Sequence, residues 1–238
     1  MTFEAAIPDP AHAGQAIYTP GTLALYDLVV LAVSNPLIWR CPTRRILELY
    51  DRHVATEHLD VGVGTGWYLD HCRFPRGEAP PRVGLLDLNP HSLAAASRRV
   101  ARYRPELYQA DVLRPLRVGA EPFGSVALTY LLHCLPGAIE EKAAVVLDNL
   151  APLLRPDAVV FGATLLSAGV KRSRAAGALM RAYNRKGVFS NEADSLAGLR
   201  AVLERRFRSV ELEVVGCAAL FVARGGEGGA PTPAAPTR

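Results

Sequence analysis

Residues 58–67, His-Leu-Asp-Val-Gly-Val-Gly-Thr-Gly-Trp, decide the fold of this chain. An apolar run leads to Asp60, three glycines follow at alternate positions, and a helical pattern begins at Trp67. Glycine lets a backbone turn sharply and approach a ligand closely. The start of the following helix offers free N–H groups to a polar ligand group. The stretch therefore predicts a strand, a ligand-binding turn and a helix.

Short apolar runs alternate with helical patterns around this turn. The expected strands are Glu57–Val61, Arg82–Asp87, Leu107–Ala110, Ser125–Thr129, Ala158–Ala163, Val210–Val215 and Ala218–Ala223. The expected helices are Leu23–Ser34, Pro42–His53, Trp67–Cys72, His91–Tyr103, Ile139–Leu154 and Asn191–Phe207. This order predicts an α/β fold, a doubly wound and mostly parallel seven-stranded sheet with helices on both faces. Only Gly216-Cys217 separates the last two strands, so one of them is expected to run antiparallel.

Local signals predict two helix starts and one helix end. Asn89-Pro90 combines an N-cap residue with proline at the first helical position. Asn191 is followed by Glu192 and Asp194, acids that suit the positive end of a helix. Asn35-Pro36 is expected to close the helix before it, because the residue before a proline disfavours the helical region.

The chain divides into three parts. Residues 1–53 are expected to form an irregular arm and cap helices, and residues 54–224 the ligand-binding α/β domain. Residues 167–190 interrupt that domain as a partly helical cap insertion. Residues 225–238 are rich in Gly, Pro and Ala and are expected to be disordered.

Composition favours a cytoplasmic enzyme. Half of the 238 residues are apolar, but no apolar run approaches the roughly 18 residues of a membrane span, so no membrane partner is expected. The N-terminus has no basic region of the kind that begins a secretory signal. The four cysteines form no C-x-x-C pair, so no zinc or other metal site is expected.

The net charge of +4 admits a nucleic-acid partner as an alternative. Nearly all the positive charge is arginine, and Ala, Gly and Pro are abundant, which is the codon bias of a GC-rich genome. We therefore expect a small-molecule substrate rather than nucleic acid. The oligomeric state stays open.

The turn differs from the dinucleotide-binding turn in two respects. Its glycines follow G-x-G-x-G, whereas the dinucleotide fingerprint is G-x-G-x-x-G. Asp60 at its mouth would repel a pyrophosphate and would attract a cationic amine or sulfonium. A nicotinamide oxidoreductase is therefore the weaker alternative.

Two further acids follow the next two strands. Asp87 ends one of them, where a carboxylate fits the two hydroxyls of a ribose. Asp111 follows the other, placed to accept from the amine of an adenine ring lying beside Val112 and Leu113. Three acids without a basic phosphate clamp predict a phosphate-free nucleoside ligand.

Four stretches together resemble class I S-adenosylmethionine (SAM)-dependent methyltransferases: LDVGVGTG at 59–66, LLDLNPHSL at 85–93, ADVL at 110–113 and SVALTYLLHCLPG at 125–137. The resemblance implies a Rossmann-like domain, SAM as cofactor and methylation of a small organic acceptor in specialised metabolism. It implies that the cofactor-binding residues are Asp60, Gly62, Gly64, Thr65, Gly66, Asp87, Leu88, Asp111, Val112, Thr129 and Tyr130.

The acceptor side is less defined by motifs. SAM carries its own leaving group, so methyl transfer to O, N or C needs alignment more than a base. His133 is the candidate base, because a histidine suits deprotonation of a hydroxyl or amine. The candidate acceptor-binding residues are Tyr18, Trp39, His133, Tyr183 and Asn184, of which the aromatic ones could equally pack the helices onto the sheet.

Other methyltransferase subclasses fit less well. Residues 127–137 hold no acid, which a metal-dependent catechol-type enzyme would need. Thr129-Tyr130-Leu131-Leu132 does not resemble the D/N-P-P-Y/F motif of nucleobase amino-methylating enzymes. Six cations make the 167–190 insertion basic, either to attract an acidic substrate or to solvate a helix face. A SAM-fold protein without methyl transfer and an RNA-associated methyltransferase remain alternatives.

Overall fold

The structure is a computed structural model that describes residues 27–226. Its strands are β1 Glu57–Val61, β2 Arg82–Asp87, β3 Glu106–Gln109, β4 Phe123–Thr129, β5 Leu154–Leu165, β6 Phe207–Val215 and β7 Ala218–Gly226. Its longer helices are α3 Thr43–His53, α5 Pro90–Arg99, α6 Ile139–Leu150, α7 Arg174–Arg185 and α8 Leu196–Glu204. A 12-residue π-helix, η1 Asp27–Ile38, precedes them, and the shorter elements are α4 Trp67–His71 and the 3₁₀ turns η2 Ala101–Tyr103, η3 Leu132–Cys134 and η4 Ala151–Leu153.

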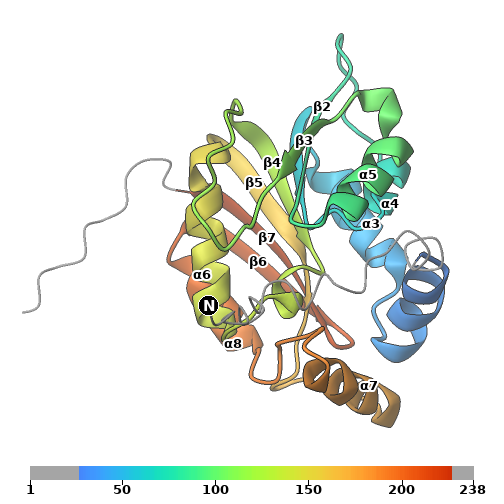
Figure 1. The fold of residues 1–238 in the computed structure, drawn as a ribbon. Helices are drawn as coiled ribbons and strands as arrows, with labels where there is room; N and C mark the ends of the chain where they lie inside the picture. Colours follow the sequence, from blue (N-terminus) through green and yellow to red (C-terminus); the bar gives the residue numbers. More distant parts are fainter. Residues whose placement is uncertain (1–26, 227–238) are drawn as a thin grey trace, which may run out of the picture.

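The predicted fold is confirmed. The seven strands lie in the order β3-β2-β1-β4-β5-β7-β6 (Figure 1). β1 to β5 pair in parallel, and β7 runs antiparallel to both β5 and β6, joined to β6 through Gly216-Cys217. This is a doubly wound, Rossmann-like sheet whose order reverses between β1 and β4.

Helices cover both faces of the sheet (Figure 1). α3, α4 and α5 pack on one face, where Ile46, Leu69 and Ala96 join the buried cluster. α6 and α8 cover the other face in a second cluster. Neighbouring residues of β2 divide between the two, Leu85 into the first and Leu86 into the second. That alternation follows from the two-residue period of a strand and explains its continuous apolar sequence.

The predicted helix start at Asn89 is confirmed. The Asn89 side chain accepts a hydrogen bond from the backbone N–H of His91, and Pro90 is the first residue of α5. Residues 174–185 of the expected insertion form α7, whose N-cap Ser173 accepts from the N–H of Ala176. The arm before residue 27 and the tail after residue 226 lie outside the described residues.

The predicted helix end at Asn35-Pro36 is wrong, because η1 continues through Pro36 to Ile38. In a π-helix each N–H bonds the carbonyl five residues earlier, so proline frees the carbonyl of Leu31. The hydroxyl of Thr43 donates to that carbonyl at 2.6 Å and so replaces the missing bond. A contact from a different helix therefore removes the penalty on which the prediction rested.

The predicted helix start at Asn191 is also wrong. α8 begins at Leu196, and the side chain of Ser195 caps it by accepting from the N–H of Gly198. The Asn191 side chain instead donates to the carbonyl of Leu165 at 2.9 Å, and Asp194 forms an ion pair with Lys142 at 2.8 Å. Residues 191–194 thus anchor the segment after α7 to the end of β5.

No helix within residues 27–226 is long and apolar enough to cross a membrane.

Candidate functional site

The glycine turn after β1 has backbone angles that favour glycine. Gly62, Gly64 and Gly66 have φ of 73°, 51° and 73°, the left-handed region that side chains strain. A Cβ on Gly66 would also lie 3.1 Å from the backbone of Ala96 in α5. The turn therefore needs glycine both for its curvature and for the close packing of two helices.

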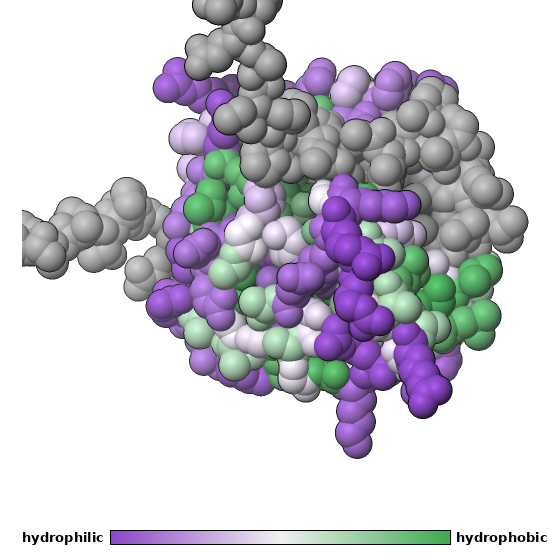
Figure 2. Space-filling model, turned by 60° about the horizontal axis from the view of Figure 1, so that its bottom comes forward, coloured by the Kyte–Doolittle hydropathy of each residue, from purple (hydrophilic) through white to green (hydrophobic). Residues whose placement is uncertain are grey.

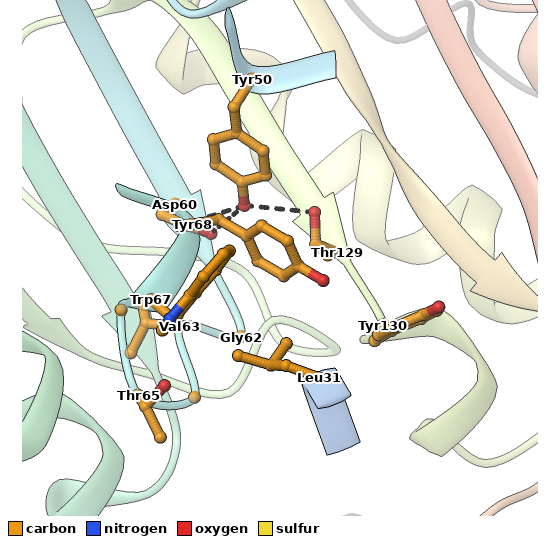
Figure 3. Close-up of a pocket in the computed structure, with 12 residues that line it drawn as sticks. Leu31, Tyr50, Asp60, Gly62, Val63, Thr65, Trp67, Tyr68, Thr129 and Tyr130 are labelled. Atoms are coloured by element: carbon orange, nitrogen blue, oxygen red, sulfur yellow. Dashed lines mark hydrogen bonds between the residues drawn. The ribbon is translucent and has the colours of Figure 1, made fainter. Parts of the chain in front are cut away.

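A cavity lies against this turn at the carboxyl ends of β1 and β4 (Figure 3). It is lined by Leu31, Tyr50, Asp60, Gly62, Val63, Gly64, Thr65, Gly66, Trp67, Tyr68, Thr129 and Tyr130. Seven of the expected cofactor-binding residues thus share one cavity, and its lining includes no Lys or Arg. Its volume is only about 40 Å³, and Leu31 of η1 closes one side of it (Figure 3).

Asp60 lies at the centre of a buried polar cluster. The phenolic oxygen of Tyr50 lies 3.4 and 3.3 Å from the two Asp60 carboxylate oxygens, and its hydroxyl donates to Thr129 Oγ1 at 3.1 Å. Figure 3 shows the three side chains converging from α3, β1 and β4. Burial raises the pKa of Asp60 to about 8, and the nearby Asp87 carboxylate adds to that rise. A cationic group that enters the cavity would stabilise the ionised form of Asp60 by direct charge attraction.

Asp87 lies at the end of the neighbouring strand β2. Its carboxylate accepts the N–H of Asn89 at 2.8 Å. Burial raises its pKa to about 6, although the N–H groups of Asn89, Gly64 and Val63 favour its ionised form. Asp87 therefore contacts the glycine turn itself, and the structure brings Asp60 and Asp87 to one sheet edge.

The other expected adenine and ribose residues lie farther along this edge and do not line the cavity. Asp111 follows β3, where it accepts from the N–H of Leu113 at 2.9 Å and lies 3.4 Å from the Arg114 guanidinium. Val112 is buried, and its carbonyl accepts from Asn149 at 2.9 Å. Leu88 directly follows β2 and is partly exposed. Asp111 thus already has partners, and its contact with adenine stays a prediction.

Tyr130 follows β4 with an unusual backbone. Its φ of 58° is uncommon for a bulky side chain, and such conformations gather at functional sites. Its N–H donates to the carbonyl of Ala163 at 2.7 Å, which extends the β4–β5 pairing and holds the strain in place. The side chain consequently lines the cavity rather than following the direction of the strand.

His133 lies one turn beyond Tyr130 and is buried. Its Nδ1 lies 3.3 Å from the N–H of Leu165 and accepts from it, which places the ring proton on Nε2. Burial, together with the charge of Lys142, lowers its pKa to about 3. The ring is therefore neutral at physiological pH, and it does not line the cavity. Its role as a base stays a prediction that this burial makes less favourable.

Phe189 brings the expected acceptor residues together. Its ring centroid lies 6.2 Å from that of Trp39, 4.5 Å from that of His133 and 4.8 Å from that of Tyr183. The His133 ring lies in turn 5.6 Å from that of Tyr130. One row of aromatic rings thus runs from the cofactor cavity to the cap, although Trp39 itself is buried.

Asn184 lies in α7 and Tyr18 lies outside the described residues. The Asn184 amide donates to Asn191 Oδ1 at 2.9 Å, and its oxygen accepts the N–H of Asn191 at 3.0 Å. This pairing holds the segment after α7 in place. A contact between Asn184 and an acceptor stays a prediction.

Sequence reasoning did not assign five residues of the cavity: Leu31, Tyr50, Val63, Trp67 and Tyr68. The rings of Tyr50 and Tyr68 stack at 5.3 Å, and the Tyr50 hydroxyl joins the Asp60 cluster. Tyr50 lies in the correctly predicted helix Pro42–His53, where the helical spacing of apolar residues assigns it to the face packed on the sheet. Only the position of that helix over β1 and β4 reveals the use of its hydroxyl. Within residues 27–226, no group of three or more His, Cys, Asp or Glu side chains is arranged to hold a metal ion.

Comparisons with known proteins agree with this geometry. Residues 59–160 match the family model described as a methyltransferase domain. The chain is 40% identical over 208 residues to demethylluteothin O-methyltransferase of Streptomyces thioluteus, covering 87% of this chain and 89% of that one. It is 39% identical over 216 residues to a physcion biosynthesis cluster O-methyltransferase of Aspergillus chevalieri, covering 90% and 96%.

Among solved structures, the fold resembles that of a DhpI–SAH complex, with a TM-score of 0.62 at 15% identity over 91% of this chain and 97% of that one. The sheet order, the glycine turn beside Asp60 and the extent of identity to the two O-methyltransferases lead to one conclusion. The chain belongs to the class I SAM-dependent methyltransferases.

Proposed function

We propose that this enzyme transfers the methyl group of SAM to a hydroxyl of a small, largely apolar organic acceptor in specialised metabolism. The observation that carries the proposal is the cavity that joins Asp60 and the glycine turn to Thr129 and Tyr130. The choice of oxygen is supported by the two relatives, which are O-methyltransferases, one acting on demethylluteothin and one of a physcion biosynthesis cluster. An amine acceptor is the alternative outcome of the test below.

The residues around the cavity fit the cofactor. A buried carboxyl with no cation beside it in the cavity suits the positively charged methionine end of SAM and would repel a pyrophosphate. We assign Asp60, Gly62, Gly64, Thr65 and Gly66 to that end and Asp87 with Leu88 to the ribose. Asp111 and Val112 are assigned to the adenine, and Thr129 with Tyr130 to the side of the transferred methyl. The nicotinamide alternative offers no such charge match.

We propose that η1 moves when the cofactor binds. The cavity volume of about 40 Å³ is well below the roughly 300 Å³ or more of ligand sites. Leu31 is the lining residue contributed by η1, whereas the glycine turn and β4 belong to the sheet edge. We therefore assign the opening motion to η1 and the fixed part of the site to the strand ends.

When bound, SAM supplies a methyl group already activated by its sulfonium. The protein then aligns the acceptor oxygen with that methyl group and excludes water. The row of rings formed by Tyr130, His133 and Phe189 offers an apolar wall for this purpose. We assign Trp39, Tyr183, Asn184 and Tyr18 to the acceptor side as supporting residues. His133, held neutral, would orient the acceptor through its Nε2 proton. The acceptor hydroxyl releases its proton to solvent as it reacts, and the S–CH3 bond breaks to leave S-adenosylhomocysteine as a neutral thioether.

We place the enzyme in the cytoplasm. Its four cysteines are free thiols, three of them buried, as expected in a reducing compartment.

The proposal is tested by calorimetry with SAM and S-adenosylhomocysteine, followed by turnover of SAM with matched phenols and anilines. Saturable binding of both nucleosides and methylation of the phenols is the expected result. Methylation of the anilines alone would move the proposal to nitrogen. Binding without turnover of any acceptor would favour a SAM-fold protein with another reaction.

A further inference from the structure

The positive charge of this protein is concentrated in the segment that contains α7. Residues 167–190 hold six cations and no acid: Lys171, Arg172, Arg174, Arg181, Arg185 and Lys186. Because the whole chain carries +4 and this segment +6, the remaining residues together carry a net −2. The basic character noted in the composition is therefore a local property of the cap.

These six cations lie in one segment and lack acidic partners within residues 27–226, whereas several arginines elsewhere have one. Elsewhere Arg82 pairs with Glu106 at 2.8 Å and Arg206 with Asp148 at 2.7 Å. All six cations of the α7 segment are exposed, and none forms an ion pair with a carboxylate of residues 27–226. Figure 2 turns the bottom of the molecule in Figure 1, where α7 lies, toward the reader. Strongly hydrophilic side chains gather on this face. Uncompensated charge of this density attracts anions.

Three of the arginines surround a hollow. Val170, Arg172, Ser173, Arg174, Gly177, Ala178 and Arg181 line an open space of about 640 Å³. That volume lies within the range of about 300–1,000 Å³ that small-molecule sites occupy. A Cβ on Gly177 would lie 3.4 Å from Nη1 of Arg181, which places that guanidinium beside α7 at this position.

One of the arginines is held in place by the protein. Nη1 of Arg172 donates to Ser167 Oγ at 2.7 Å and lies 3.9 Å from Sδ of Met180. The hydroxyl of Ser173 caps α7, so the helix start adds its partial positive charge to the same hollow. Planar guanidinium groups bind carboxylates and phosphates through two parallel hydrogen bonds, which a mobile lysine cannot reproduce.

We propose that the hollow of Arg172, Arg174 and Arg181 is a binding site for a small anion, a carboxylate or phosphate group. The anion is either part of the acceptor or a separate molecule that binds the cap. A hollow of ligand size favours a small anion over an extended polyanion such as RNA. The assignment to the acceptor rests on the proposed function, whereas the anion site itself does not.

The experiment compares two double variants of the full-length protein. R174Q/R181Q removes two charges from the hollow, and R185Q/K186Q removes two exposed charges of the same segment that do not line it. Inorganic phosphate is titrated into each by calorimetry at constant ionic strength. We expect saturable binding that weakens at least tenfold in R174Q/R181Q and changes less than twofold in R185Q/K186Q. SAM affinity should be unchanged in both.

Two results would overturn the site: no saturable phosphate binding, or an equal loss in both double variants. An equal loss accompanied by salt-dependent binding of single-stranded RNA would identify a polyanion surface instead. The source of the anion is decided with 4-hydroxybenzoate and its methyl ester as acceptors. If the KM for the acid is tenfold higher in R174Q/R181Q than in the wild type, and the KM for the ester is unchanged, the anion is part of the acceptor. If the variant and the wild type have equal KM values for both compounds, the anion is a separate molecule. The phosphate titration judges the site whether or not these acceptors are methylated.

Discussion

Two regions differ in how far apart along the chain their contacting residues lie. One is the cofactor edge, the edge of the sheet that forms the cavity beside Asp60, and the other is the cap, residues 167–190. At the cofactor edge, seven of the twelve residues that line the cavity lie within residues 58–67, and the others come from η1, α3, α4 and the end of β4. At the cap, Phe189 contacts Trp39 and His133, which are 150 and 56 positions away in the sequence. A local motif supplies most of the cofactor cavity, whereas a change in any one of several distant segments would reshape the proposed acceptor side. This division suits an enzyme family that keeps one cofactor and varies its acceptors.

The largest expected effect concerns the attachment of the cap. Lys142 and Asp194 form an ion pair at 2.8 Å with side chains 0% and 1% exposed, and the Lys142 ammonium also donates to the carbonyls of Leu135 and Ser190. Lys142→Met leaves the carboxyl buried without a partner, so the free energy of unfolding should fall by about 3–5 kcal/mol. Urea denaturation measures it.

Two controls accompany this variant. Lys142→Met combined with Asp194→Leu removes both charges and should recover most of the loss. Arg206→Met breaks the ion pair with Asp148, whose side chain is 62% exposed, and should cost less than about 1 kcal/mol. A loss from Lys142→Met no larger than that from Arg206→Met would contradict the view that the cap is anchored by buried polar contacts.

The next effect concerns the cofactor edge. Asp60→Asn removes the charge that we assign to the methionine end of SAM, so SAM affinity should fall by about 2–3 kcal/mol, or about 30- to 150-fold. In the wild type, affinity should rise from pH 6 toward pH 8, because cofactor binding favours the ionised form of an acid whose pKa is about 8. Calorimetry at several pH values should show that the variant lacks this dependence.

The same substitution should stabilise the free protein. The pKa of Asp60 is raised on folding, so its contribution to stability is complete below about pH 4 and is lost as pH rises through about 8. Thermal unfolding without cofactor should therefore show a smaller fall in Tm from pH 5 to pH 8.5 in Asp60→Asn than in the wild type. Parallel curves would mean that Asp60 is not a buried acid with a raised pKa.

The difference in range also explains what the sequence could predict. The seven strands, the reversed β7 and the Asp60 turn depend on local pattern, and all were found. The end of η1 was missed because Thr43, from another helix, bonds the carbonyl that Pro36 frees. The start of α8 was missed because the Asn191 side chain donates a hydrogen bond to the carbonyl of Leu165 instead of capping a helix. Tyr50 and Lys142 were missed for the same reason, since their polar atoms acquire a function only through distant partners.

A smaller effect is expected at Asp87, which we assign to the ribose. Asp87→Ala removes a charge-assisted acceptor, so SAM affinity should fall by about 1–3 kcal/mol. Asp111→Ala is compared with it, because Asp111 is assigned to the adenine but already accepts from Leu113 and lies 3.4 Å from Arg114, so a smaller loss is expected. Unchanged SAM affinity in Asp87→Ala would show that Asp87 does not contact the ribose. The local motif that binds the cofactor would then be limited to the turn after β1.

The smallest expected effect is at His133, where the cofactor edge meets the cap. His133→Asn should leave S-adenosylhomocysteine affinity within about twofold, since the ring lies outside the cavity. Turnover should fall about tenfold, or 1.4 kcal/mol, because the aromatic wall beside Phe189 is lost. With the pKa lowered to about 3, the wild-type rate should show no histidine titration between pH 5 and pH 8. A limb near pH 6–7 that disappears in His133→Asn would instead establish a catalytic base, and the two regions would then share a titrating residue as well as a wall of rings.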